Sequence, residues 1–277
     1  MPTTLSQATA SSHSPMKAPI ATISIVSHGQ MELVLPLLQD LDTVHHTTPL
    51  HVVLTLNVPE AIPCVPEDFA FSLQIMRNSQ PLGFGANHNR AFSQAQGGIF
   101  CVLNPDIRIT QNPFPDLLKA CADPHTGLAA PAIYSPSGQL EDSARKFPTP
   151  WRIAHRVLTR RRTRDYAAPT TVLHPDWVAG MFLLLRTTVY RQLGGFDERY
   201  FLYYEDVDLC ARARLAGLEI VQLALPGVIH NAQRASHRNP KYLRWHVGSM
   251  LRFFTSAAFL RWQWLRLTQR VPPRSSP

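Results

Sequence analysis

The chain has 277 residues, of which 45% are hydrophobic and 17% are charged. This composition excludes an intrinsically disordered protein and suits one α/β domain of generous size, or one domain with an appendage. Lys and Arg number 27 against 19 Asp and Glu, so the formal net charge is +8. A basic protein favours an anionic partner, such as nucleic acid, nucleotide phosphates or a lipid surface, and the charge alone does not decide among them.

The four cysteines, Cys64, Cys101, Cys121 and Cys210, have neither CxxC nor zinc-finger spacing, which favours reduced thiols in a cytosolic protein. Residues 1–18 are rich in Ser, Thr, Ala and Pro and lack an apolar core of signal-peptide length. We therefore expect a disordered leader there. No uncharged apolar run approaches the roughly 20 residues that a spanning helix needs, so we expect a soluble or surface-bound protein.

The first half of the chain alternates between strand-like and helix-like segments. Apolar runs typical of buried strands lie at 21–28, 51–58 and 99–106, and an alternating run at 71–78 predicts a further strand. Helical spacing covers 29–41, where Pro36 could bend the helix or mark a late start, and a Gly/Asn turn opens a helix over 83–98. This rhythm predicts an α/β fold with a mostly parallel sheet flanked by helices. Ligands bind at the carboxyl ends of strands in such sheets, so we expect the polar loops there to form a site.

The second half of the chain is less regular. Residues 127–150 combine short strands and turns, and 177–201 indicate a strand, a helix and a glycine turn. A helix with acids in its first turn is expected over 205–217, followed by one strand over 219–230 that ends in a histidine. From residue 240 onward the pattern predicts one or two amphipathic helices rich in arginine and aromatic side chains.

Two loop motifs carry candidate chemistry. Asn104-Pro105-Asp106 ends a strand-like run, and its carboxylate could hold a divalent cation that bridges two phosphates; the same tripeptide is also ordinary turn chemistry. Residues 83–89, GFGANHN, offer amide donors, but they lack the third glycine of a dinucleotide fingerprint and equally suit a helix N-terminus.

Two further candidates lie in the second half. Glu205 and Asp206 follow an aromatic run, 200–204, that could stack on a sugar ring. Acids in a first helical turn commonly just stabilise the helix dipole, but either could also deprotonate an acceptor hydroxyl as a general base. His230 is either a structural histidine or a metal ligand.

The order of these segments resembles the family 2 glycosyltransferases of the GT-A fold over about residues 20–235. The most specific part is GGFDERYFLYYEDVDLCARARLAG, and NPD is the usual form of the metal motif in the rhamnosyltransferase-like branch. The resemblance implies a Rossmann-like GT-A domain over 19–238, and the residue pattern predicts a basic-aromatic helical tail over 239–277. It also implies an inverting, metal-dependent enzyme that moves a sugar from a nucleotide-sugar donor to a saccharide or polyprenyl-linked acceptor in cell-surface polysaccharide synthesis.

The resemblance also assigns roles to particular residues. Asp206, paired with Glu205, would be the catalytic base, and Asp106 and His230 would hold Mg²⁺ or Mn²⁺ against the donor diphosphate. The segment under the donor sugar and acceptor would be Trp177, Ala179 and Gly180, with Tyr204 beside it. The donor and its nucleotide would contact Ser27, His28, Asn57, Asn78, Gly83, Phe84, Asn87, Asn89, Asn104 and Asp106.

One position departs from the family pattern. The family usually has Asp-Asn after the second strand, where this chain has Leu56-Asn57. The substitution removes an acceptor for the base or ribose of the nucleotide, and it leaves the metal and base residues unchanged.

The positive charge is concentrated in two segments. Residues 210–277 hold eleven Lys and Arg and one acid, which suits either an amphipathic helix on an anionic membrane or a helix packed on the domain with its arginines in solvent. Residues 145–164 hold eight and no acid, which suits either a solvated helix face or an acceptor-side lid that reaches a phosphate of a polyprenyl-diphosphate acceptor. We therefore expect a cytoplasmic protein, peripheral on the inner face of the plasma membrane.

Other classes of function stay open at this point. A nucleotidyltransferase is disfavoured because no Gly-rich phosphate loop follows the first strand. A basic nucleic-acid-binding protein would need arginines and aromatics on one exposed face and no sugar-nucleotide site. A catalytically inactive relative is conceivable because of Leu56. The sequence does not specify the sugar, the nucleotide, the acceptor or the oligomeric state.

Overall fold

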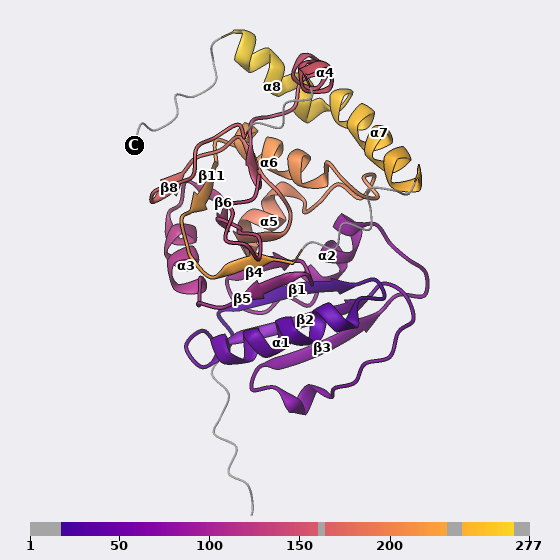
Figure 1. Ribbon diagram of the computed structural model, residues 1–277, viewed down its shortest axis with the longest axis vertical. Helices are drawn as coiled ribbons and strands as arrows, with labels where there is room; N and C mark the ends of the chain where they lie inside the picture. The colour runs from indigo at the N-terminus through magenta and orange to yellow at the C-terminus, as the bar shows by residue number, and fades with distance from the viewer. Residues whose placement is uncertain (1–17, 160–163, 232–239, 269–277) are drawn as a thin grey trace, which may run out of the picture.

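An eight-stranded sheet forms the centre of the molecule (Figure 1). The computed structural model describes residues 18–159, 164–231 and 240–268, so nearly all of the expected leader and the end of the expected tail lie outside the described residues. The strand order is β3-β2-β1-β4-β10-β6-β11-β8. The strands are β1 (Ala21–Ser27), β2 (Leu50–Leu56), β3 (Ser72–Arg77), β4 (Ile99–Leu103), β6 (Thr126–Pro131), β8 (Val172–Leu173), β10 (Phe182–Arg186) and β11 (Glu219–Leu223).

Most neighbours in this sheet are parallel, as predicted. Strands β1 to β4 pair in parallel, as do β6 and β11, whereas β10 runs antiparallel to β4 and β6. Alternate side chains of β4 enter two separate cores: Cys101 and Leu103 pack with α1 and α3, and Phe100 and Val102 pack with α5 and α6. The helices are α1 (Met31–His45), α2 (Phe84–Phe92), α3 (Phe114–Ala122), α4 (Pro150–Thr159), α5 (Thr187–Leu193), α6 (Glu205–Leu215), α7 (Pro240–Phe254) and α8 (Ala257–Leu267), with a 3-10 turn, η1 (Pro66–Asp68).

The segment 219–230 is not one strand, and that prediction was wrong. Strand β11 ends at Leu223, and the chain then turns through Gly227, whose φ of +85° is strained for other residues. It continues as β12 (Val228–His230), which pairs antiparallel with β5 (Ile107–Ile109) in a separate two-stranded sheet. The consequence is functional, because this pairing places the end of β12 beside the turn at Asp106.

Three other local expectations also need correction. Helix α1 begins at Met31 and continues through Pro36, so the proline does not mark its start. Helix α2 ends at Phe92 rather than near residue 98. Helix α3 and strand β5 were not anticipated, and a further short ladder joins β7 (Ala144–Arg145) to β9 (Trp177–Val178).

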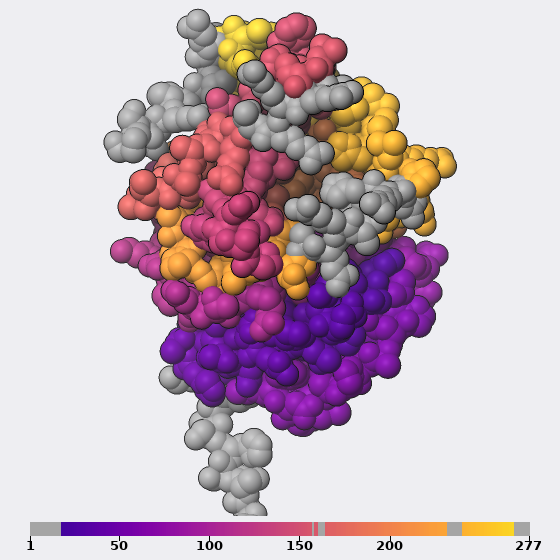
Figure 2. All heavy atoms as spheres, viewed as in Figure 1, coloured from indigo at the N-terminus to yellow at the C-terminus, as the bar shows by residue number. Residues whose placement is uncertain are grey.

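The two C-terminal helices pack against the domain. Phe253 and Phe259 are buried in the core formed with α6, and the Trp262 ring lies 4.9 Å from the Phe147 ring. The Ser249 hydroxyl donates to the Leu202 carbonyl over 2.9 Å. Figure 2 shows α4, α7 and α8 gathered at the end of the molecule opposite the N-terminal half. The described part of the tail is therefore continuous with the domain.

Gly83 allows two distant loops to touch. The Phe84 amide donates to the Phe201 carbonyl over 2.8 Å, and a Cβ on Gly83 would lie 2.7 Å from that same oxygen. We expect Gly83→Ala to lower the free energy of unfolding by about 1–3 kcal/mol, because the loops would have to separate. Urea denaturation measures this loss. Gly98→Ala is the matched control, since its Cβ would meet no atom within 4 Å; equal losses in both variants would contradict the explanation.

Candidate active site

Two cavities lie next to each other at the carboxyl edge of the sheet, and Tyr242 of α7 lines both. The first, here called the strand-end cavity, has a volume of about 470 Å³. The second, here called the Asp206 cavity, has a volume of about 630 Å³. Both volumes fall in the usual range for small-molecule sites, about 300–1,000 Å³.

The strand-end cavity is formed where β1, β2 and β4 end and α2 begins. The loops after these strands therefore meet, as expected for a parallel sheet. Of the residues expected at the donor, those that line it are His28, Asn57, Phe84, Asn87, Asn104 and Asp106. The C-terminal helix α7 closes it with Lys241, Tyr242 and Trp245. Those three were not expected at the site, because the sequence pattern indicated only a basic amphipathic helix there.

Four other residues expected at the donor do not line the strand-end cavity. The Ser27 hydroxyl accepts from the Gln30 amide, and Gly83 precedes α2. Asn78 donates to Asn87 and Asn57 over 2.6 and 2.8 Å. The Asn89 side-chain oxygen accepts from the Tyr190 hydroxyl and the Phe196 amide, and so ties α2 to the loop before α6. These contacts suit residues that hold the walls in place.

Leu56 belongs to the hydrophobic core. Its side chain is buried at the end of β2, among the residues that pack against α1. Asn57, the next residue, faces the cavity, and its side-chain oxygen accepts from the Leu82 and Asn78 nitrogens, each over 2.8 Å. The departure from Asp-Asn thus falls on a core residue that does not line the strand-end cavity, and it leaves Asn57, Asp106 and Asp206 in place.

Asp106 and His230 are in direct contact. The β5–β12 ladder brings Asp106 Oδ2 to 3.0 Å from His230 Nε2, and Glu141 Oε2 lies 2.7 Å from His230 Nδ1. Burial alone would lower the imidazole pKa, but the hydrogen bonds and charges of the two carboxylates outweigh it and raise the pKa to about 9. Glu141 was not expected here, since a single acid in a turn-rich segment gives no sequence signal.

The Asp106–His230 pair fits a divalent cation that takes the place of the proton on His230 Nε2, since a metal-bound imidazole is neutral. Asp106 Oδ1 is buried without a hydrogen-bond partner, so a hard oxygen ligand is available beside the imidazole nitrogen. Glu141 on the other ring nitrogen matches the carboxylate that usually orients a metal-bound histidine. Among the described residues, no group of three or more His, Cys, Asp or Glu side chains is arranged as a metal site. The protein would therefore supply only part of the coordination shell.

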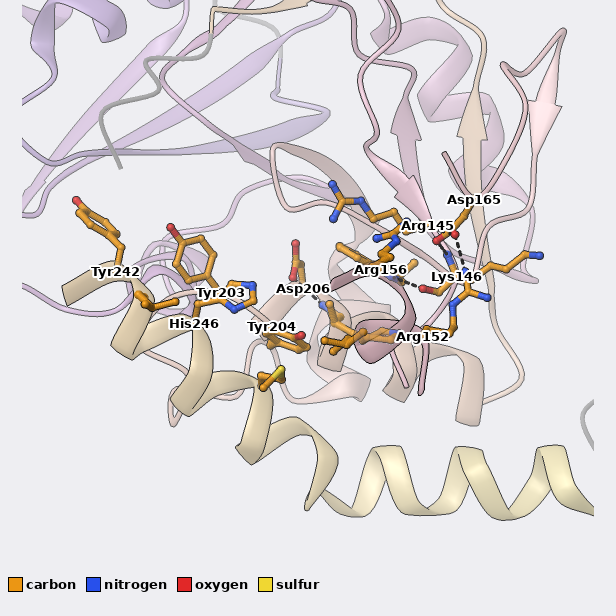
Figure 3. A pocket seen from close by; sticks show the side chains of 16 residues that line it. Arg145, Lys146, Arg152, Arg156, Asp165, Tyr203, Tyr204, Asp206, Tyr242 and His246 are labelled. Atoms are coloured by element: carbon orange, nitrogen blue, oxygen red, sulfur yellow. Dashed lines mark hydrogen bonds and ion pairs between the residues drawn. The ribbon is translucent and has the colours of Figure 1, made fainter. Parts of the chain in front are cut away.

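Asp206 points into the second cavity (Figure 3). Its Oδ2 accepts from the Gly180 amide over 2.9 Å, and its Oδ1 accepts from the Val207 amide over 2.8 Å. Burial raises the pKa of this carboxyl, and the backbone donors and the charge of Arg145 partly offset the rise. A fixed carboxylate with a raised pKa, facing a cavity, has the attributes of a general base.

Of the other residues expected near the acceptor, two line the Asp206 cavity and two contribute through their backbone amides. Trp177 and Tyr204 line the Asp206 cavity. Gly180 contributes through its amide on Asp206, and the Ala179 amide donates to the Ser143 carbonyl over 2.8 Å. Ala179 lines neither cavity, so it holds the segment in place.

Glu205 lies apart from both cavities. Its side chain is 5% exposed and lies next to Gly85 of α2, and its Oε2 has no hydrogen-bond partner. Burial and the adjacent Asp206 charge raise the pKa of Glu205 well above its ordinary value. Of the two candidate bases, only Asp206 reaches a cavity.

The backbone just before Asp206 is strained. Tyr203 and Tyr204 have φ values of 69° and 68°, a conformation that costs bulky residues about 1–3 kcal/mol each. Both rings pack against His246 of α7, with centroids 5.3 and 5.5 Å away, and Tyr204 also packs on Phe253. Helix α7 thus holds the strained turn that starts α6, and this turn orients Asp206.

Comparisons with known sequences agree with this site. The family described as Glycosyl transferase family 2 matches residues 66–186. Rhamnosyltransferase WbbL of Escherichia coli (strain K12) is 31% identical over 195 residues, which cover 64% of this chain and 72% of that protein. The chain belongs to glycosyl transferase family 2.

A second relative is matched over a smaller share of its length. N-acetylglucosaminyl-diphospho-decaprenol L-rhamnosyltransferase of Mycobacterium tuberculosis is 29% identical over 198 residues, 61% of this chain. The match spans 62% of that enzyme.

Solved structures share the fold at low sequence identity. GalNAc-T7 with UDP, GalNAc and Mn²⁺ aligns with a TM-score of 0.61 at 14% identity, covering 87% of this chain and 48% of that one. Mannosyltransferase PcManGT from Pyrobaculum calidifontis, with GDP-Man and Mn²⁺, aligns with a TM-score of 0.54 at 17% identity, covering 85% and 65%. These similarities establish the GT-A fold expected from the sequence.

Proposed function

We propose that the protein is an inverting, metal-dependent glycosyltransferase that moves a sugar from a nucleotide-sugar donor to a lipid-linked acceptor in cell-surface polysaccharide synthesis. The observation that carries the proposal is the placement of Asp206, a fixed carboxylate facing one cavity, beside a second cavity that contains Asp106. The names of the two rhamnosyltransferase relatives support both the reaction and, for the mycobacterial enzyme, a lipid-linked acceptor.

In this proposal the donor occupies the strand-end cavity. Asp106 and His230 would hold Mg²⁺ or Mn²⁺, and the ion would neutralise charge on the leaving nucleoside diphosphate. Glu141 orients the His230 ring through Nδ1. Phe84 and Asn87, from the first turn of α2, form part of the cavity wall.

The acceptor occupies the Asp206 cavity. The Gly180 and Val207 amides fix the Asp206 carboxylate, which takes the proton of the acceptor hydroxyl. The hydroxyl oxygen forms a bond to the anomeric carbon as the bond from that carbon to the diphosphate oxygen breaks. Attack from the face opposite the leaving group inverts the anomeric configuration.

A panel of sugar nucleotides tests the donor assignment. A ligand that binds only the folded protein raises its melting temperature by mass action. We expect one nucleotide-activated sugar, with L-rhamnose as the first candidate, to shift the melting temperature selectively and more strongly with Mn²⁺. No shift with any sugar nucleotide, together with salt-dependent DNA binding, would favour the nucleic-acid-binding alternative.

We also propose that α4, α7 and α8 rest on an anionic membrane. Exposed apolar side chains on these helices include Trp151, Leu158, Leu243, Leu251, Leu260, Trp264 and Leu267. The same helices carry arginines and no acid, so apolar contact and charge attraction act together. None of the helices in the described part of the chain has the length and apolar character needed to cross a bilayer.

Flotation with liposomes checks the membrane prediction. We expect the full chain to float with phosphatidylglycerol-containing vesicles and less with pure phosphatidylcholine. Leu260→Gln combined with Leu267→Gln should reduce flotation, because both side chains are exposed on α8. Val65→Gln, an exposed position on the loop before η1, is the control. Equal flotation of all three proteins would exclude α8 as the membrane contact.

A further inference from the structure

The Asp206 cavity carries more positive charge than base catalysis requires. Four cations line it, Arg145 and Lys146 at β7 and Arg152 and Arg156 on α4. Two acids, Asp165 and Asp206, also line it, and Arg145 is paired with Asp142 over 3.1 Å, so the lining keeps an excess of one positive charge. The sequence left open whether the basic segment that includes α4 is a solvated face; the structure turns these two arginines toward the cavity.

Asp165 holds the two α4 arginines as a pair. Its Oδ1 lies 2.5 Å from Arg152 Nη2 and 3.3 Å from Arg156 Nη2, and its side chain is only 10% exposed. The Asp165 carboxylate thus neutralises one of the two charges and fixes both guanidinium groups. Paired, oriented guanidinium groups are well suited to bidentate binding of phosphate oxygens.

The position of this pair distinguishes the acceptor from the donor. Figure 3 shows Asp206 in the middle, with Tyr242 on one side and the group Arg152, Arg156 and Asp165 on the other. Tyr242 is the residue shared with the strand-end cavity. The arginines therefore lie on the side of Asp206 that faces away from the proposed donor site.

The lining of the Asp206 cavity is also partly apolar. Ile153 of α4 and Leu243 and Met250 of α7 also line the cavity. On the outer surface of α4, Trp151 and Leu158 are 77% and 81% exposed. The cavity thus combines aromatic walls and a base, a basic group, and an apolar border between two helices.

We propose that Arg152 and Arg156, with Lys146, bind the diphosphate of a lipid-linked sugar acceptor, whose sugar lies at Asp206 and whose prenyl chain leaves between α4 and α7. A diphosphate diester carries two negative charges, which match the net charge of +2 on Lys146, Arg152, Arg156 and Asp165. This inference rests on the proposed function, because it takes the Asp206 cavity as the acceptor site. It adds the residues that bind the group carrying the acceptor sugar.

Isothermal titration calorimetry on the full chain tests the subsite with farnesyl diphosphate as the probe. We expect farnesyl diphosphate to bind at least about tenfold more tightly than farnesol, because charge-assisted hydrogen bonds contribute about 1.5–3 kcal/mol. Inorganic diphosphate and UDP serve as probes for a free diphosphate and for a donor nucleotide. Stronger binding of farnesyl diphosphate than of inorganic diphosphate shows that the apolar border contributes.

Paired variants assign the binding to the arginines. Arg152→Gln combined with Arg156→Gln should weaken farnesyl diphosphate binding by about 10- to 100-fold, and Mn²⁺-dependent sugar-nucleotide binding should not change. Arg156→Lys keeps the positive charge and should therefore lose less affinity for farnesyl diphosphate than the double glutamine variant. This graded loss separates phosphate binding from a purely structural role of Arg156. Arg199→Gln is the control, since Arg199 also pairs with an aspartate, Asp197, but lies outside the cavity.

The outcomes separate this inference from the proposed function. Unchanged farnesyl diphosphate binding in the double glutamine variant, or equal binding of farnesol and farnesyl diphosphate by the native protein, would overturn the subsite. Loss of UDP binding in that variant, with farnesyl diphosphate unaffected, would assign the arginines to the donor and also overturn it. Failure of the proposed function would instead appear as absent sugar-nucleotide binding and transfer in the native chain.

Discussion

Asp206→Asn should lower kcat for sugar transfer by about 10²- to 10⁴-fold, the usual contribution of a general base, and should leave donor binding unchanged. The amide cannot take the acceptor proton, but it retains the shape of the carboxylate. Because Gly180 and Val207 donate to the two carboxylate oxygens, the amide nitrogen faces one backbone donor, and a modest loss of stability is expected. Single-turnover transfer and donor titration, measured on the same preparation, separate these effects.

Glu205→Gln is the matched control for Asp206→Asn. Glu205 is the neighbouring acid in the same helical turn, but it is buried against α2 and lines neither cavity. Its raised pKa favours the neutral form, which glutamine resembles in shape. We expect this variant to retain transfer activity. If Glu205→Gln abolished transfer and Asp206→Asn did not, the assignment of the base would be reversed.

Asp106→Asn should remove the Mn²⁺ enhancement of donor binding. The substitution replaces a charged oxygen ligand by a neutral one and leaves the neighbouring His230 with one carboxylate partner, Glu141. Calorimetric titration of the sugar nucleotide, with Mn²⁺ and with EDTA, measures the enhancement. The native protein should show it, and the variant should bind equally weakly in both conditions.

Glu141→Gln should weaken the Mn²⁺ enhancement less than Asp106→Asn does. Glu141 contacts the ring nitrogen of His230 that faces away from Asp106, and the loss of such an orienting partner usually costs about 10- to 100-fold in metal affinity. Asp106→Asn should therefore have the larger effect. A full Mn²⁺ enhancement in both variants would exclude this cluster as the metal site.

Local patterns were sufficient to predict much of the fold. The runs that became β1, β2 and β4 are short, apolar and buried, and β3 is a half-exposed alternating run. All four are separated by helix or turn signals, so their type and parallel pairing could be deduced. Expectations failed where the deciding interaction is distant in the chain. The chain turns at Gly227, and β12 then pairs with β5, more than a hundred residues earlier. The alternation of apolar and polar residues within a segment does not predict which distant strand it pairs with.

The candidate site likewise has residues that could be predicted from the sequence and residues that could not. The resemblance named Asp106, His230 and Asp206, and the fold brings the first two into contact. Asn89 carries the same side-chain amide as the donor-site candidate Asn87, but it does not face the cavity. Its side-chain oxygen accepts from the Phe196 amide, because the glycine turn at 194–195 passes directly over it. Tyr242 and His246 could not be found from sequence, because the amphipathic pattern of α7 does not reveal which groups its inner face meets.

The stereochemistry of the product tests the central claim most directly. The account predicts that the native enzyme, given a sugar nucleotide, Mn²⁺ and a lipid-linked acceptor, forms a glycosidic bond whose anomeric configuration, read by proton NMR, is opposite to that of the donor. In the proposed mechanism Asp206 deprotonates the acceptor hydroxyl, which attacks from the face opposite the leaving diphosphate, and this single displacement inverts the configuration. A product with the configuration of the donor would contradict the account.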